Sequence, residues 1–228
     1  MLATEKSYQK NVNNTLIDIY KKDLLPENHI KFLEKMKNEF YFEPKVCYDI
    51  GSCVLHWTRH AERIWKNTKV ILFDAYDPVE VFYKNHRYHI GVLANEDKKN
   101  VKYYQNDFLF GGNSIYKENN HKVFPASNYT VKTTKTLDTI VKEKNFPLPD
   151  LIKIDVQGSE LDILKGATNV LSHATYLIVE LQSVPYNRDA PLANVTIDYL
   201  EKNDWKLIAP KFSDNGPDAD YCFINLKK

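Results

Sequence analysis

Asp155 is the residue of this 228-residue sequence that is best placed to do chemistry. The apolar run Leu151–Ile154 predicts a short buried strand that ends at Asp155, and Gly158 and a helical leucine pattern follow. In open parallel α/β sheets, ligands bind beyond the carboxyl ends of the strands. A carboxylate there can act as a general base, whereas its structural alternative is to cap the following helix.

Two other charged residues are expected close to Asp155. Side chains alternate along a strand, so Lys153 lies on the same face as Asp155 and places a cation behind the acid. A buried lysine is either an ion-pair partner or a base with a lowered pKa. A second buried strand, Thr175–Leu181, offers Glu180 near its carboxyl end, which makes Glu180 a second candidate for catalysis.

A strand, a glycine turn, a helix and a second strand precede this region. The segment Lys45–Gly51 predicts a strand with Asp49 near its end and Gly51 at the turn, followed by a helix from about residue 56 to 66. The next strand ends at Asp74, roughly twenty residues beyond the turn, which is where an acid binds ribose hydroxyls in nucleotide-binding sheets. The unit therefore predicts a site for a cofactor that contains adenosine.

The glycine turn discriminates between two candidate cofactors that contain adenosine, a nicotinamide dinucleotide and S-adenosylmethionine. A dinucleotide needs three glycines so that its pyrophosphate reaches the helix, and this turn has only Gly51. Asp49 would repel phosphates but would suit the ammonium group of a methionine moiety. The turn favours S-adenosylmethionine, and a nicotinamide oxidoreductase is the disfavoured alternative.

The remaining patterns predict a layered α/β domain. Residues 7–42 predict two helices, interrupted at Pro26, that cover a sheet edge and part of the pocket. Strands are expected at 88–93, 101–105 (an antiparallel addition), 130–134, 205–209 and 221–226, and helices at 137–144 and 192–203. Residues 106–125 predict a mobile loop of the kind that closes over substrates, and the acids of residues 214–220 predict a solvated turn.

Composition excludes several classes of protein. The chain is 43% hydrophobic and 27% charged, which indicates one globular unit, and its net charge of +1 gives no reason to expect a nucleic-acid partner. No apolar run reaches membrane-spanning length and the N-terminus does not resemble a signal peptide, so we expect a cytoplasmic protein without membrane insertion. The three cysteines, an odd number, are expected to be reduced thiols.

Several motifs resemble those of the FkbM-type methyltransferases. The strongest is KIDVQGSELDILKGA at residues 153–167, and the others are YDIGS (48–52), LFDA (72–75), GGNS (111–114), TLDTIV (136–141) and IVEL (178–181). The resemblance covers about residues 46–182. It implies a Rossmann-like class I methyltransferase fold, with a mostly parallel seven-stranded sheet, helices on both faces and an antiparallel hairpin at one edge. We expect a helical extension at residues 1–44 and the methyltransferase domain at residues 45–228.

The resemblance also implies roles for individual residues. Asp49, Gly51, Ser52 and Cys53 should bind the methionine end of S-adenosylmethionine, Asp74 the ribose, and Ala75 and Val92 should lie beside it, while Asp155 should face the transferred methyl group. Candidate catalytic residues are Asp155, Lys153, Glu180 and the loop residue His121. Candidate substrate-binding residues are Asn113, Ser114, Gln157 and Glu160, although Glu160 is equally placed to complement a helix dipole.

The acceptors of this family are usually hydroxyls of sugars or other small natural products, so an O-methyltransferase acting on a sugar or glycan is expected. Asp155 is the preferred base. In an alternative mechanism, Asp155 and Glu180 hold a divalent cation, Mg²⁺ or Mn²⁺, that acidifies the hydroxyl. Two alternatives to the predicted function are a catalytically silent binding module with the same fold and an O-methyltransferase acting on a molecule other than a sugar.

Overall fold

The computed structural model describes residues 2–120, 122–214 and 216–228 and contains a seven-stranded sheet. The strand order is β3 (Arg87–Ile90), β2 (Lys69–Asp74), β1 (Val46–Ile50), β7 (Leu151–Ile154), β8 (Tyr176–Gln182), β10 (Asp218–Asn225) and β9 (Trp205–Asp214). The first five strands run parallel, and β10 is antiparallel to both of its neighbours. The predicted fold class, a class I methyltransferase sheet with an antiparallel edge, is confirmed.

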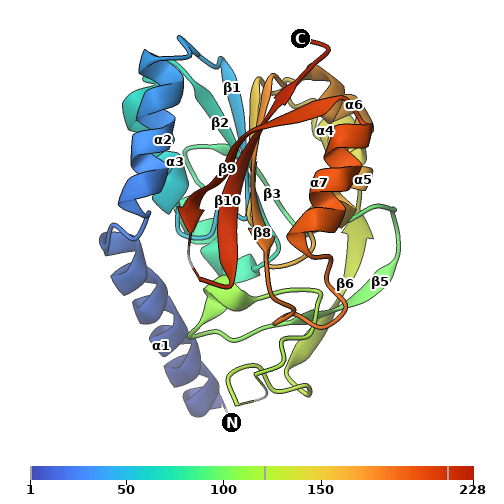
Figure 1. Cartoon of the computed structure of the whole chain (residues 1–228). Coiled ribbons are helices and arrows are strands. Elements are labelled where there is room, and N and C mark those ends of the chain that lie inside the picture. The colour runs from blue at the N-terminus through green and yellow to red at the C-terminus, as the bar shows by residue number, and fades with distance from the viewer. Residues whose placement is uncertain (1, 121, 215) are drawn as a thin grey trace.

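Helices cover both faces of this sheet (Figure 1). One face carries α1 (Leu2–Lys21), α2 (Glu27–Asn38) and α3 (His56–Ile64), and the other carries α4 (Leu137–Lys144), α5 (Glu160–Lys165), α6 (Thr168–His173) and α7 (Ala193–Lys202). All residues of β1 and β7 are buried, because a parallel sheet between two layers of helices has no solvent-exposed face.

The two N-terminal helices belong to the same apolar core as the sheet. They are separated around Pro26, as the sequence predicted. Val12 and Leu16 of α1 and Leu33 and Met36 of α2 are almost completely buried in one cluster with residues of the central strands. Helix α2 therefore lies where its side chains can reach the carboxyl edge of the sheet.

A second, three-stranded sheet lies beyond the carboxyl ends of the main strands (Figure 1). It consists of β4 (Val92–Leu93), β6 (Tyr129–Lys135) and β5 (Asn100–Tyr104), with β5 antiparallel to β6. The single strand predicted at residues 88–93 is wrong, because the chain passes from the main sheet to the small sheet at Gly91. The antiparallel pairing expected for residues 101–105 exists, but within this small sheet.

The last hairpin is longer than the sequence pattern predicted. Strand β9 continues to Asp214 and β10 begins at Asp218, so Asp220 is a strand residue with only 4% of its surface exposed. The expectation that residues 214–220 form a solvated turn is therefore wrong for Asp220. Among the described residues, no helix is long and apolar enough to span a membrane, and all three cysteines are free thiols.

Candidate active site

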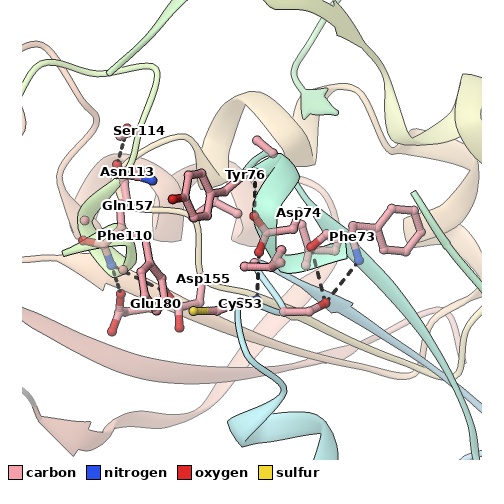
Figure 2. Close-up of a pocket in the computed structure, with 18 of the residues that line it drawn as sticks. Cys53, Phe73, Asp74, Tyr76, Phe110, Asn113, Ser114, Asp155, Gln157 and Glu180 are labelled. Carbon is pink, nitrogen blue, oxygen red and sulfur yellow. Dashed lines mark hydrogen bonds between the residues drawn. The ribbon is translucent and has the colours of Figure 1, made fainter. Parts of the chain in front are cut away.

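A cavity of about 710 Å³ opens at the carboxyl ends of β1, β2, β7 and β8. Its volume falls within the roughly 300–1,000 Å³ that is usual for small-molecule sites. The strand order reverses between β1 and β7, and this is the position where open α/β sheets bind ligands. Figure 2 shows two groups of lining residues, Asp74 and Tyr76 on what we call the β2 side and Asp155, Gln157 and Glu180 on the β8 side.

The β2 side contains six of the residues that the sequence assigned to cofactor binding. Gly51, Ser52, Cys53, Asp74, Ala75 and Val92 all line the cavity there. Asp74 is held by two backbone N–H groups, those of Cys53 and Tyr76, each donating at 2.8 Å. Burial raises the pKa of Asp74, although these two hydrogen bonds act in the opposite direction.

Gly51 is required by the neighbouring strand. Its φ is +80°, and a Cβ atom there would lie 1.7 Å from the carbonyl oxygen of Asp155. Its N–H donates to the carbonyl of Phe73, so this N–H is already used within the protein. The glycine therefore allows β1 to pass close to Asp155, and it joins the two sides of the cavity.

Ser52 and Cys53 shape the turn. The Ser52 hydroxyl donates to the carbonyl of Asp49 at 2.6 Å and is nearly buried. Burial is the main cause of the raised pKa of the Cys53 thiol, and nearby Asp74 adds to it. Cys53 therefore remains a neutral thiol that packs against the cavity wall.

Asp49 does not line the cavity, which corrects the prediction that it contacts the methionine end directly. Its side chain has no exposed surface and accepts a hydrogen bond from Thr58 Oγ1 at 2.6 Å. Register explains its position, because Asp49 pairs with Lys153, one pleat below Asp155. Asp49 is therefore linked to the cavity-facing Asp155 through Lys153.

Lys153 joins the two acids as an ion-pair partner. Its Nζ lies 3.3 Å from Oδ1 of Asp49 and 3.3 Å from Oδ2 of Asp155, and it donates to the carbonyl of Gly51 at 3.2 Å. Burial acts to lower its pKa, but the surrounding carboxylates outweigh burial and raise it. These contacts favour the ion-pair role of Lys153 over the alternative in which it is the base.

Asp155 and Glu180 form a coupled pair. Burial opposes ionisation of Asp155, but the charge of Lys153 and hydrogen bonds from its neighbours outweigh burial and keep its pKa below the ordinary value. Burial and the Asp155 carboxylate raise the pKa of Glu180 well above its ordinary value. Asp155 is therefore the ionised member and Glu180 the protonated member of the pair.

Gln157 connects this pair to the cavity wall. Its Nε2 atom lies 3.0 Å from Oε2 of Glu180 and 3.5 Å from Oδ1 of Asp155, and its Oε1 accepts a hydrogen bond from the Tyr186 hydroxyl at 3.2 Å. Both ends of the amide are thus engaged within the protein. Gln157 lines the cavity, as predicted for a substrate residue, but its contacts orient the carboxyl pair.

Asn113 and Ser114 also lie on the cavity wall. Ser114 donates to the carbonyl of Gln157 at 2.7 Å and accepts the N–H of Tyr116, so its hydroxyl fixes the loop. Oδ1 of Asn113 accepts the N–H of Asn106 at 2.7 Å, whereas its buried Nδ2 has no partner among the described residues. Asn113 therefore keeps a free donor that a bound ligand can satisfy.

Glu160, which was predicted to bind the substrate, does not line the cavity. Glu160 is buried behind the strand end and accepts the N–H groups of Val156 and Gly158, which makes it a cap of the loop rather than a substrate ligand. Burial raises its pKa to about 7. His121 lies outside the described residues, so its expected role is unaffected by the structure.

Sequence reasoning missed two aromatic residues of the β2 side. The rings of Tyr76 and Phe110 are nearly parallel, with an interplanar angle of 9° and centroids 5.9 Å apart. Both are buried and line the cavity (Figure 2). Tyr76 follows Asp74 by two residues, and this proximity was the available signal, whereas Phe110 reaches the cavity from a loop whose path the sequence did not indicate.

Asp107 connects this aromatic wall to the N-terminal helix. The Tyr76 hydroxyl donates to Oδ1 of Asp107 at 2.9 Å, and the hydroxyl of Tyr8 in α1 donates to Oδ2 at 2.7 Å. The carboxylate of Asp107 therefore links Tyr8 of α1 to Tyr76, which follows β2.

Three further residues at the β8 side were also missed. His29 of α2, Trp57 of α3 and Asp220 of β10 line the cavity and are linked by hydrogen bonds. Their association depends on helix packing and strand pairing, which leave no local pattern in the sequence.

The carboxylates fit a divalent cation poorly. The ammonium group of Lys153 already balances Asp155, and Glu180 holds a proton that a metal ion would have to displace. Within residues 2–120, 122–214 and 216–228, no group of three or more His, Cys, Asp or Glu side chains is arranged to hold a metal ion. The charge beside Asp155 is therefore supplied by Lys153 and not by Mg²⁺ or Mn²⁺.

Solved structures of methyltransferases are similar to this fold. The O-methyltransferase TomG from Streptomyces achromogenes has a TM-score of 0.51 and 8% sequence identity, with 95% of this chain and 89% of that chain covered. A putative O-methyltransferase from Klebsiella pneumoniae has a TM-score of 0.50 and 11% identity over the same shares of the two chains. At these identities the similarity shows the fold alone.

Sequence comparison identifies the family. The Hexuronic acid methyltransferase AglP of Haloferax volcanii is 36% identical over 77 residues, which are 34% of this chain and 32% of that protein. The chain thus matches about a third of the length of this curated relative. Residues 49–207 match the Methyltransferase FkbM domain, and this stretch contains the β2 side, Lys153, Asp155 and Glu180. The chain therefore belongs to the FkbM family of S-adenosylmethionine-dependent methyltransferases.

Proposed function

We propose that this methyltransferase transfers the methyl group of S-adenosylmethionine to a hydroxyl of a sugar. The observation that carries this proposal is the ionised Asp155 on the cavity wall, held by Lys153 and by the protonated Glu180. A fixed carboxylate facing a cavity suits a reaction in which a hydroxyl must lose its proton. The match to a methyltransferase of hexuronic acid supports a sugar as the acceptor.

The residues of the β2 side fit the cofactor. Asp74 offers carboxylate oxygens to ribose hydroxyls, and the Tyr76 and Phe110 rings with Val92 provide an apolar wall for adenine. Gly51 keeps the turn close to Asp155, so a methionine moiety bound along this turn points towards the β8 side. The acidic surroundings favour a cofactor with a positively charged sulfur.

When bound, S-adenosylmethionine supplies an electrophilic methyl group on its sulfonium. The Asp155 carboxylate accepts a hydrogen bond from the acceptor hydroxyl and directs its oxygen towards that group. Transfer would break the carbon–sulfur bond, form a carbon–oxygen bond and leave S-adenosylhomocysteine, and Asp155 would take the proton of the acceptor hydroxyl. A carboxylate with a lowered pKa can accept this proton late in the reaction, and the product is a methyl ether.

Lys153, Gln157 and Glu180 orient Asp155 in this scheme. They contact both carboxylate oxygens, so the side chain is fixed before the acceptor binds. Such preorganisation removes the cost of arranging the base during the reaction.

Calorimetry and a transfer assay test the proposal. We expect the purified protein to bind S-adenosylhomocysteine and not NAD, and to transfer a labelled methyl group to sugars in a panel. If the protein binds S-adenosylhomocysteine but transfers the methyl group only to hydroxyls of other molecules, the acceptor is not a sugar. Binding of NAD without binding of S-adenosylhomocysteine would contradict the assigned cofactor.

A further inference from the structure

Asp220 is a buried acid that faces the β8 side of the cavity. It lies directly opposite Glu180 in the antiparallel pairing of β10 with β8, so the two side chains share one face of the sheet. Oδ2 of Asp220 accepts a hydrogen bond from Nδ1 of His29 at 3.0 Å. Asp220 lines the cavity, and only 4% of its surface is exposed.

His29 is fixed at both ring nitrogens. The indole N–H of Trp57 donates to Nε2 of His29 at 2.9 Å. Because an indole nitrogen can only donate, Nε2 is the acceptor and the ring proton is on Nδ1, from which it reaches Asp220. The ring is 2% exposed and meets Phe212 edge to face at 5.1 Å. Helices α2 and α3 thus determine the orientation of Asp220.

No lysine or arginine other than Lys153 lines the described cavity, and Lys153 is already paired with Asp49 and Asp155. Asp220 and the Asp155–Glu180 pair therefore present carboxyl oxygens to the acceptor without a second cation beside them. An acceptor that carries its own carboxylate would meet like charge in a buried site, which is costly. Sugar hydroxyls, in contrast, can donate charge-assisted hydrogen bonds to Asp220.

We propose that Asp220 binds the acceptor, that His29 positions Asp220, and that the acceptor is an uncharged sugar rather than a hexuronic acid. This inference rests on the proposed sugar O-methyltransferase function. His29 and Asp220 both lie outside residues 49–207, the segment that matches the FkbM domain. The part of the site that selects the acceptor is thus supplied by the flanks of the chain.

The first experiment compares acceptors with the unaltered chain. Methyl glucoside and methyl galactoside are compared with the matching glucuronic and galacturonic acid glycosides, using labelled S-adenosylmethionine. We expect kcat/KM to be at least about tenfold higher for the uncharged member of each pair. Equal or better transfer to the uronic acids would overturn the inference and leave the proposed function intact. Transfer to no sugar, with S-adenosylhomocysteine still bound, would overturn the proposed function and this inference with it.

The second experiment tests Asp220 directly. Asp220→Asn keeps an oxygen that accepts a hydrogen bond from His29 but removes the charge. We expect the KM for the acceptor to rise about tenfold. The ratio of kcat/KM between the uncharged sugar and the matching uronic acid should fall. Affinity for S-adenosylhomocysteine should stay within about twofold, which also verifies folding. Asp204→Asn is the matched control, because Asp204 is an exposed acid that pairs with Lys227 and does not line the cavity. Equal losses in both variants, or an unchanged acceptor KM in Asp220→Asn, would contradict the role of Asp220.

The third experiment separates positioning by His29 from simple support of the fold. His29→Gln retains an N–H that can reach Asp220, whereas His29→Ala does not. We expect both variants to bind S-adenosylhomocysteine, with the acceptor KM raised in His29→Ala and largely restored in His29→Gln. If both variants lose kcat and cofactor affinity together, with no change confined to the acceptor KM, His29 does not position Asp220.

Discussion

The ammonium nitrogen of Lys153 lies 3.3 Å from a carboxylate oxygen of Asp155, on the strand that ends at that acid. The same nitrogen lies 3.3 Å from the fully buried Asp49. One cation therefore stabilises an acid that faces the cavity and another that is enclosed by protein.

Lys153→Met should destabilise the protein strongly, because it leaves Asp49 as a buried charge without a cation. The expected loss is about 3–5 kcal/mol in the free energy of unfolding, measured with urea. Adding Asp49→Asn should restore part of the lost free energy of unfolding, since asparagine removes the buried charge and can still accept the hydrogen bond from Thr58. The surface variant Lys31→Met, which breaks an exposed pair with Glu27, should cost less than about 1 kcal/mol. Equal effects of Lys153→Met and Lys31→Met would contradict this account.

Asp155→Asn and Glu180→Gln make the same chemical change in the two members of the coupled pair. Because Asp155 is ionised and Glu180 is protonated, only the first variant removes a charge. We expect Asp155→Asn to lower kcat by roughly 10²–10⁴-fold and Glu180→Gln by less than about tenfold. S-adenosylhomocysteine affinity should change only a few-fold in either. Loss of cofactor binding in Asp155→Asn would instead place Asp155 in the cofactor site.

Gly51→Ala should prevent correct folding at the turn. Its Cβ would overlap the carbonyl oxygen of Asp155, and the φ of +80° is strained for alanine. We expect a large drop in melting temperature and loss of S-adenosylhomocysteine binding. Gly111→Ala is the matched control, because a Cβ at Gly111 meets no atom within 4 Å. Similar melting temperatures for the two variants would refute the proposed close approach of the strands.

The stability of the protein should depend on pH through Glu160. Its pKa is about 7 in the folded chain, above the ordinary value of about 4.3, so the folded state holds a proton that the unfolded state loses between these two values. The contribution of Glu160 to the free energy of unfolding is fully present below about pH 4 and is lost as the pH rises to 7. Glu160→Gln removes this dependence, so the variant should gain up to about 3 kcal/mol relative to the parent between pH 5 and pH 8. If the difference in free energy of unfolding between Glu160→Gln and the parent is the same at pH 5 and at pH 8, this prediction is wrong.

Chelation should leave turnover unchanged. Lys153 already supplies the positive charge beside Asp155 that a metal ion would otherwise supply. We expect the same kcat with and without EDTA, and no stimulation when Mg²⁺ or Mn²⁺ is added. A loss of activity with EDTA that added Mg²⁺ or Mn²⁺ reverses would require a metal site.

The strand ends could be predicted from sequence because each depends on local patterns. Asp74 and Asp155 follow apolar runs directly, and both line the cavity. The depth of Asp49 could not be predicted in this way, since it depends on the register that sets Asp49 beside Lys153. The division of residues 88–93 between two sheets also depends on pairing partners far along the chain.

The end of the site that we propose for the acceptor was not predictable for the same reason. His29 and Asp220 are 191 positions apart, and the packing of α2 against the β9–β10 hairpin, through Phe212 of β9, brings them together. Glu160 differs, because its place in the first turn of α5 left a structural role open beside the substrate role, and in the structure it accepts two loop N–H groups.

The order of the strands has an evolutionary consequence. Asp74 is on β2, while Asp220 is on β10, four places further along the sheet. Under the roles proposed above, mutations in the terminal hairpin or in α2 can change which acceptors bind while the residues proposed to bind the cofactor stay the same. Relatives with nearly identical central motifs can consequently diverge in what they modify.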